Sequence, residues 1–141
     1  MRIIAQNLQP SALEHLGLVA SIQDLVAANR PPNGIPAVSF QHYNFPGNLA
    51  PATALQLYRI IQEALHNALK HAEASEILIQ LNGEKDGYSI LVEDDGKGFD
   101  TTKVTDGNGL ENMQKRAEFL GTELTIDSGG RGTTVFLNGV V

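Results

Sequence analysis

The stretch QEALHNALKHAE, residues 62–73, has the pattern of a helix with two different faces. Its polar side chains gather along one edge, which is called the polar stripe below: Glu63, His66, Asn67, Lys70 and His71. At 100° per residue, Glu63, Asn67 and Lys70 project within about 60° of one another, and the two histidines flank them. A surface helix more often alternates acids and lysines, so this grouping calls for an explanation.

The other face of this helix is apolar, with Ile61, Leu65, Ala68 and Ala72 placed to cover a sheet. Two interpretations of the polar stripe stay open: a solvated surface, or a row of ligand contacts. Each histidine taken alone is typical of a surface position. Asn67 favours ligand contacts, because asparagine is a poor residue inside a helix and its carboxamide oxygen is a good ligand for hard cations.

The composition is that of a folded domain. The 141 residues fit one domain, and 42% apolar with 18% charged residues are enough to build a core. The absence of cysteine excludes disulfides and thiolate metal sites, and a net charge of -6 argues against general nucleic-acid binding. No apolar run approaches the roughly 20 residues that span a bilayer, and no secretory leader precedes the body. We therefore expect a soluble, cytoplasmic protein.

The first part of the chain predicts helices. Residues 1–10 have helical character up to a break at Pro10. Apolar residues at helical spacing then continue from Leu13 to Val26, and the pair Pro31–Pro32 ends the pattern. We expect a helix in this second segment.

The rest of the chain predicts one layer of helices and one of strands. Residues 35–45 predict a strand, with Val38, Phe40 and Tyr43 at roughly alternating positions, and the long helix should run from about Pro51 to Ala72. The later elements are strands at 76–83 and 88–94 joined by a turn at 84–87, a glycine-rich loop at 96–109, a helix at 110–121, and strands at 122–129 and 132–141. This order predicts an α+β fold, a two-layer α/β sandwich with helices packed on one face of a mixed β-sheet.

A second motif, VEDDGKGFD at residues 92–100, ends a predicted strand. It places Asp94, Gly96 and Gly98 in a D-x-G-x-G pattern, which is common in turns. The spaced glycines also remove side chains from a wall, so that a flat ligand can lie against the backbone while the carboxylate accepts a hydrogen bond from it.

Two further glycine motifs follow. In GNGLENMQKR, Gly107 and Gly109 lie just before a helix start, where free amides and the helix dipole favour phosphate. This is not a dinucleotide fingerprint, because no strand directly precedes it and Asn112 stands in place of the third glycine. The last motif, GRGTT at residues 130–134, opens the final strand.

Together, these four motifs resemble the ATP-binding catalytic domain of sensor histidine kinases, in the superfamily shared with gyrase and the MutL repair proteins. EALHNALKH resembles its N box, DDGKGF its G1 box, GNGLENM its G2 box and GRGTT its closing motif, over roughly residues 36–141. The segment LQPSALEHLGLVASIQDL is similar to the one that leaves the dimerisation helices in the nitrate-sensor and DesK-like subfamily, where Glu, here Glu63, begins the N box. The resemblance implies a Bergerat-type ATP-binding fold.

The resemblance also implies roles at the base of ATP. Asp94 should accept a hydrogen bond from the adenine amine, and Gly96 and Gly98 should shape the base pocket. Thr133 should support Asp94 through a shared water.

At the phosphates, the resemblance implies Asn67 as the ligand of Mg²⁺. Lys70 and His71 should contact phosphate oxygens. Gly107 and Gly109 should hinge a lid over the nucleotide and present amides to the triphosphate, and Leu110 should also bind ATP. Glu63 should act as the general base or orient the attacking group.

The implied domains are the end of a truncated dimerisation helix at 1–10, a linker and first helix at 11–35, and the ATP-binding catalytic domain at 36–141. The implied function is transfer of the ATP γ-phosphoryl group to a histidine on a dimerisation domain missing from this chain, within a two-component pathway that ends on a response regulator. His15 and His42 lack the context of that acceptor, so we expect no autophosphorylation by the isolated chain, whose parent kinase could be membrane-anchored.

Three alternatives share parts of this pattern. Serine kinases of the anti-sigma type carry the same boxes, but the segment before the N box favours a histidine kinase. Gyrase-like ATPases use a glutamate of this helix to activate water, but they need a transducer domain, and nothing follows Val141. A non-enzymatic module would keep a degenerate pocket, whereas all four boxes here are intact.

Overall fold

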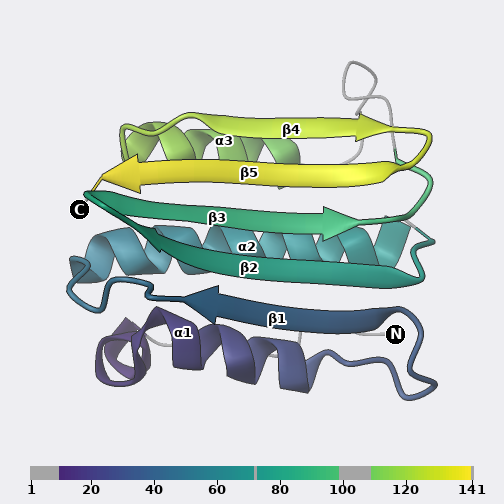
Figure 1. Ribbon diagram of the computed structural model, residues 1–141, viewed down its shortest axis with the longest axis horizontal. Coiled ribbons are helices and arrows are strands. Elements are labelled where there is room, and N and C mark those ends of the chain that lie inside the picture. Colours follow the sequence, from purple (N-terminus) through teal and green to yellow (C-terminus); the bar gives the residue numbers. More distant parts are fainter. Residues whose placement is uncertain (1–9, 72, 99–108, 141) are drawn as a thin grey trace.

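The computed structural model describes residues 10–71, 73–98 and 109–140. The expected helix at 1–9, Ala72 and most of the glycine-rich loop lie outside these residues. The elements are α1 (Pro10–Ala28), β1 (Ala37–Tyr43), α2 (Pro51–His71), β2 (Glu76–Glu84), β3 (Gly87–Asp94), α3 (Gly109–Phe119), β4 (Leu124–Gly129) and β5 (Gly132–Val140) (Figure 1).

The five strands form one mixed sheet in the order β1-β2-β3-β5-β4. The β1 and β2 strands are parallel, whereas every other neighbouring pair is antiparallel. The two hairpins, β2–β3 and β4–β5, have the short turns that the sequence predicts. Their pairing brings the ends of the second and fourth motifs together, because Asp94 on β3 lies opposite Thr133 on β5.

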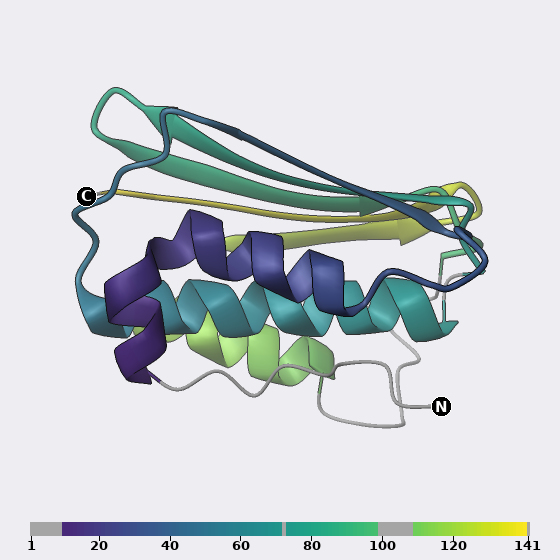
Figure 2. The ribbon, with the colours of Figure 1, turned by 90° about the horizontal axis from the view of Figure 1, so that it is seen from below.

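The helices form a second layer on one face of the sheet, which confirms the predicted two-layer sandwich (Figure 2). The α2 helix packs between α1 and α3. Its apolar face is buried as expected, with Ile61 and Leu65 fully enclosed and Ala68 nearly so. Burial of these side chains, at roughly 25 cal/mol per Å² of apolar surface, fixes which edge of α2 remains for the polar stripe.

The predicted first helix and first strand are both present, with two local details that the pattern does not give. Gly17, with φ 80 and ψ 165, interrupts α1. Glycine adopts such a backbone without the steric cost of a Cβ atom. Tyr43 does not share the buried side of β1 with Val38, because side chains alternate between faces and Tyr43 lies an odd number of residues along the strand; it is 54% exposed.

The first helix belongs to the same core as the sheet. Leu18, Ile22, Leu25 and Val26 are buried together with residues of α2 and of the strands. Within the described residues, no helix is both long and apolar enough to cross a membrane.

Candidate functional site

The polar stripe lies on the edge of α2 that the core leaves uncovered. Glu63, His66 and Asn67 are half-buried, whereas Lys70 is exposed. The backbone of His71 ends the helix, and its side chain lies outside the described part of the structure. Glu63 and Asn67 are half-buried because a neighbouring element lies against them, whereas Lys70 is accessible to solvent.

The neighbouring element is α3, and its first residue, Gly109, lies beside Glu63 and Asn67. A Cβ atom added to Gly109 would lie 2.7 Å from Glu63 Oε2 and 3.5 Å from Asn67 Nδ2. The first motif and the third therefore meet, with a glycine where a side chain would press on the Glu63 carboxylate. The start of a helix carries free amides and a partial positive charge, which suits an anion beside the stripe.

The remaining residues of the third motif divide between described and undescribed positions. Gly107 lies outside the described residues, so its predicted role in the lid stays a prediction. Leu110 is half-buried and packs against the core.

Asp94 ends β3 and is only 8% exposed. It shares the helix-facing side of the strand with buried Val92 and Ile90, since alternate residues point to the same face. The N–H of Gly96 donates to Asp94 Oδ1 at 2.9 Å. Burial raises the pKa of the Asp94 carboxyl, and hydrogen bonds from the backbone of Gly96 and Thr133 offset part of that rise. A carboxylate can accept about four hydrogen bonds, so Asp94 keeps capacity for a ligand.

Thr133 lies beside Asp94 on the next strand and is also buried. Its hydroxyl is 2.7 Å from the Ser128 hydroxyl on β4. The predicted support of Asp94 by Thr133 through water stays a prediction. Ser128 is an additional neighbour that the motifs do not reveal.

Two glycines of these motifs are required by contacts within the chain. Gly98 has φ 71, and a Cβ atom there would overlap the carbonyl oxygen of Gly129. Gly132 has φ 126, and a Cβ atom there would overlap the carbonyl oxygen of Asp94. Both glycines let the end of β3 pack closely against the β4–β5 turn. The requirement for glycine at 98 therefore follows from this backbone contact alone, without a bound ligand.

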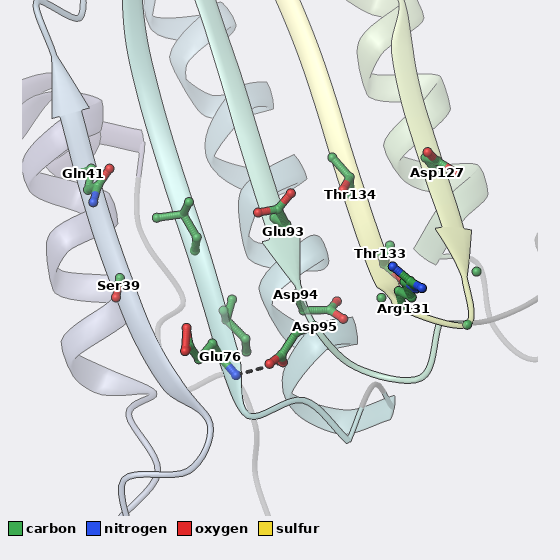
Figure 3. A pocket seen from close by; sticks show the side chains of 15 residues that line it. Ser39, Gln41, Glu76, Glu93, Asp94, Asp95, Asp127, Arg131, Thr133 and Thr134 are labelled. Atoms are coloured by element: carbon green, nitrogen blue, oxygen red, sulfur yellow. Dashed lines mark hydrogen bonds between the residues drawn. The ribbon is translucent and has the colours of Figure 1, made fainter.

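Asp95 has partners that the sequence motifs do not reveal. This exposed side chain accepts hydrogen bonds at Oδ1 from the N–H of Ser75 at 2.8 Å and at Oδ2 from the Ser75 hydroxyl. Its Oδ1 also accepts from the N–H of Glu76 at 2.9 Å (Figure 3). These bonds lower the pKa of the Asp95 carboxyl. The hairpin register could have revealed it, because Ile77 pairs with Asp94 and the next pair outward brings Asp95 to Glu76.

A cavity of about 680 Å³ opens on the sheet face away from the helices (Figure 3). Its walls include outward-facing side chains such as Gln41, Glu93 and Thr134, and at the sheet end they also include Asp94 and Thr133. None of the polar stripe lines it. We therefore assign the candidate site to the helix side of Asp94, where the motifs converge, and not to this cavity.

The described residues offer few ligands for a metal. Within them, no three histidine, cysteine, aspartate or glutamate side chains are grouped to hold an ion. Beside the start of α3, Glu63 places a carboxylate oxygen and Asn67 places its carboxamide nitrogen Nδ2. The Asn67 carboxamide also carries the oxygen that a hard cation would take. This small set fits Mg²⁺, which takes one or two protein ligands and completes its shell with phosphates and water.

Comparison with known families bears directly on this site. Residues 52–138 match the model of the histidine kinase-, DNA gyrase B-, and HSP90-like ATPase family. The chain belongs to this ATPase family. The match begins at α2 and ends within β5, so it spans all four motifs.

Among curated proteins, the family members similar to this chain are sensor kinases. The chain is 32% identical over 140 residues to the signal transduction histidine-protein kinase/phosphatase DegS of Brevibacillus brevis, covering 98% of this chain and 36% of DegS. It is 36% identical over 136 residues to the sensor histidine kinase ComP of Bacillus subtilis, covering 93% of this chain and 17% of ComP. The chain thus spans about a third or less of these relatives.

Solved structures agree on the fold. The histidine kinase domain of the blue-light activated kinase EL346 from Erythrobacter litoralis superposes with a TM-score of 0.69 at 22% identity, covering 98% of this chain and 68% of that chain. The catalytic domain of the histidine kinase ThkA has a TM-score of 0.64 at 14% identity, covering 87% of this chain and 89% of that chain. Together with the sequence relatives, they make this chain the ATP-binding catalytic domain of the kind found in two-component histidine kinases.

Proposed function

We propose that this domain binds Mg-ATP and transfers the γ-phosphoryl group to a histidine on a dimerisation domain. A response regulator would receive the phosphoryl group next, in the cytoplasm where both ATP and such regulators reside. The observation that carries the proposal is the contact of Gly109 with Glu63 and Asn67, because it joins the predicted catalytic residue, the predicted metal ligand and a helix start.

At the base end, Asp94 is the proposed acceptor for the adenine amine. Its burial, its place on the helix side of β3 and its spare acceptor capacity support this role. Guanine presents a carbonyl where adenine has its amine, so the same carboxylate would repel it. Gly96 and Gly98 leave the backbone bare beside Asp94, and Thr133 borders it from β5.

At the phosphate end, Lys70, His71 and the amides at the start of α3 are the proposed phosphate contacts. Lys70 is exposed on the polar stripe, where it can reach a bound anion. Asn67 is the proposed Mg²⁺ ligand, with Gly107 and Leu110 in the enclosing wall. Asn67 would hold the Mg²⁺, which would supply positive charge against the phosphates.

Glu63 is the proposed general base or orienting group. Its carboxylate lies beside Gly109, where α2 meets the start of α3, and this proximity supports the role. Phosphoryl transfer depends mainly on placing the nucleophile in line with the phosphorus. The stripe histidines are carried by α2 itself, so they are poorly placed to attack in line, and the acceptor must come from another element.

The test mixes this chain with radiolabelled ATP, Mg²⁺ and a separate dimerisation domain that carries the acceptor histidine. We expect acid-labile phosphate on the added domain and only traces on this chain. Glu63→Gln should remove most transfer, by about 10²-fold or more as for loss of a general base, while ATP binding stays nearly unchanged. Acid-labile phosphate on His15 or His42 of this chain alone would contradict the proposal.

A further inference from the structure

We propose that Asp95 is a positioning residue, which holds Asp94 in place for adenine by fastening the end of β3 to the junction between α2 and β2. The inference rests on the proposed function, because it takes Asp94 as the acceptor of the adenine amine. Asp95 itself would touch no ligand.

The bonds of Asp95 support this role. One oxygen accepts from two successive backbone N–H groups, those of Ser75 and Glu76, and the other oxygen accepts from the Ser75 hydroxyl. Figure 3 shows the bond from Glu76. The N–H of Asp95 also donates to the Glu76 carbonyl at 3.3 Å. Hydrogen bonds to a carboxylate are roughly twice as strong as neutral ones, so the three side-chain bonds resist displacement of the Asp95 backbone.

A second contact joins the same two segments. Lys97 Nζ lies 3.2 Å from Glu73 Oε1, although both side chains are largely exposed and such a pair contributes little alone. Glu73 has φ 53, which turns the chain sharply after α2. Asp95 and Lys97 thus hold residues 73–76 from two points along the loop that begins at Asp94.

The contacts of Asp95 and Lys97 with residues 73–76, which are called the clamp below, lie between the elements that carry the proposed ligand contacts. Residues 73–76 directly follow α2, which carries Asn67 and Lys70, and Asp95 directly follows Asp94. The clamp therefore sets the spacing between the proposed base contact and the proposed phosphate contacts. A ligand that binds both ends at once, as ATP would, depends on that spacing.

The test compares ATP with GTP affinity by displacement of a fluorescent ATP analogue. Loss of folded protein lowers both affinities by the same factor, so the ATP-to-GTP ratio reports the geometry of the base site. We expect Asp95→Ala to lower this ratio about fivefold or more, the size expected for loss of a charged hydrogen-bonding group. Asp86→Ala, which removes an exposed carboxylate at the opposite end of β3, should leave the ratio unchanged.

Two more variants make the result independent of one substitution. Asp95→Asn keeps an oxygen that can accept from both N–H groups, so its ratio should stay within about threefold of the wild-type value. Ser75→Ala removes only the hydroxyl donor and should lower the ratio about twofold. If Asp95→Ala does not fold, the Ser75→Ala ratio decides, and an unchanged value there overturns the inference.

Asp94→Asn separates this inference from the proposed function. If Asp94→Asn lowers the ratio and Asp95→Ala leaves it unchanged, Asp95 is not a positioning residue and the proposed function stands. If Asp94→Asn also leaves the ratio unchanged, the proposed function fails and the inference fails with it.

Discussion

Asp94 and Asp95 are neighbours in sequence and identical in chemistry, yet the fold gives them opposite surroundings. Asp94 faces the helix layer, is buried, and has a raised pKa because burial disfavours its charge. Asp95 is exposed and has a lowered pKa because Ser75 and Glu76 donate hydrogen bonds to it. Asp94 is the last residue of β3, whereas Asp95 is the first residue of the loop that follows, where its side chain meets the start of β2.

The difference shows how a carboxylate becomes available to a ligand. Asp95 uses its oxygens to satisfy N–H groups at the start of β2, so it contributes to the fold. Asp94 bears the cost of burial with few internal partners, a condition that often marks a functional site. In our proposal, the sequence pair DD therefore contains one residue for binding and one for positioning, and only their hydrogen-bond partners and burial distinguish them.

The variant with the largest expected effect is Gly98→Ala, which alters the loop that begins at Asp94 and Asp95 and should lower the stability of the domain. The added methyl group would overlap the Gly129 carbonyl at a backbone conformation that favours glycine, so the loop after both carboxylates must shift. We expect the free energy of unfolding to fall by about 2 kcal/mol or more, as measured by urea denaturation. Gly130→Ala is the matched control, since its methyl group would meet open space. Equal stability of the two variants would contradict the close packing of the loop.

The next effect concerns Asp94 alone. Asp94→Asn replaces the charged acceptor with an amide of the same shape, so ATP binding should weaken by about 1–3 kcal/mol. Titration calorimetry with ATP would measure this loss, and circular dichroism would check that the fold is intact. Unchanged affinity would show that Asp94 does not contact the base.

A smaller effect distinguishes the two carboxylates by pH. The pKa of Asp94 is raised above 3.8, so acidification should protonate it, and weaken ATP binding, at a higher pH than for an ordinary aspartate. The pKa of Asp95 is lowered from 3.8, so the stability that Asp95 contributes is present above pH 3.8 and is lost as the pH falls through its lowered value. ATP binding should therefore weaken before this stability is lost.

Binding and unfolding curves across the acidic range would test this order. In Asp94→Asn, the part of the pH dependence of ATP binding that comes from Asp94 should disappear. In Asp95→Ala, the fall in stability at the acid end should become shallower. Simultaneous loss of binding and stability in the unaltered chain would count against the assignment of the two roles.

The sequence predicts most of this architecture because its signals are local. The periodicity around Leu65 predicts α2, and alternation with turn residues predicts both hairpins. The motif residues Glu63, Asn67 and Gly109 are named from sequence, and the structure brings these three together. The assembly of the site could be anticipated, although the roles of its residues remain proposals.

Other features could not be predicted, because they depend on contacts between distant segments. The bonds of Asp95 require the register that places it against Ser75, and the need for glycine at 98 comes from Gly129 across the sheet end. The break at Gly17 escaped because apolar spacing continues on both sides of it. The acidic pair at 94–95 could not be divided into two roles from residue types alone.

The central claim is that the Asp94 carboxylate recognises adenine by accepting a hydrogen bond from its amine. Its most direct test is calorimetric titration of the unaltered chain with ATP and with GTP in the presence of Mg²⁺. A buried carboxylate accepts the adenine amine and repels the guanine carbonyl, so ATP should bind at least about tenfold more tightly than GTP, a difference of about 1.4 kcal/mol. Equal affinities for the two nucleotides would contradict the account.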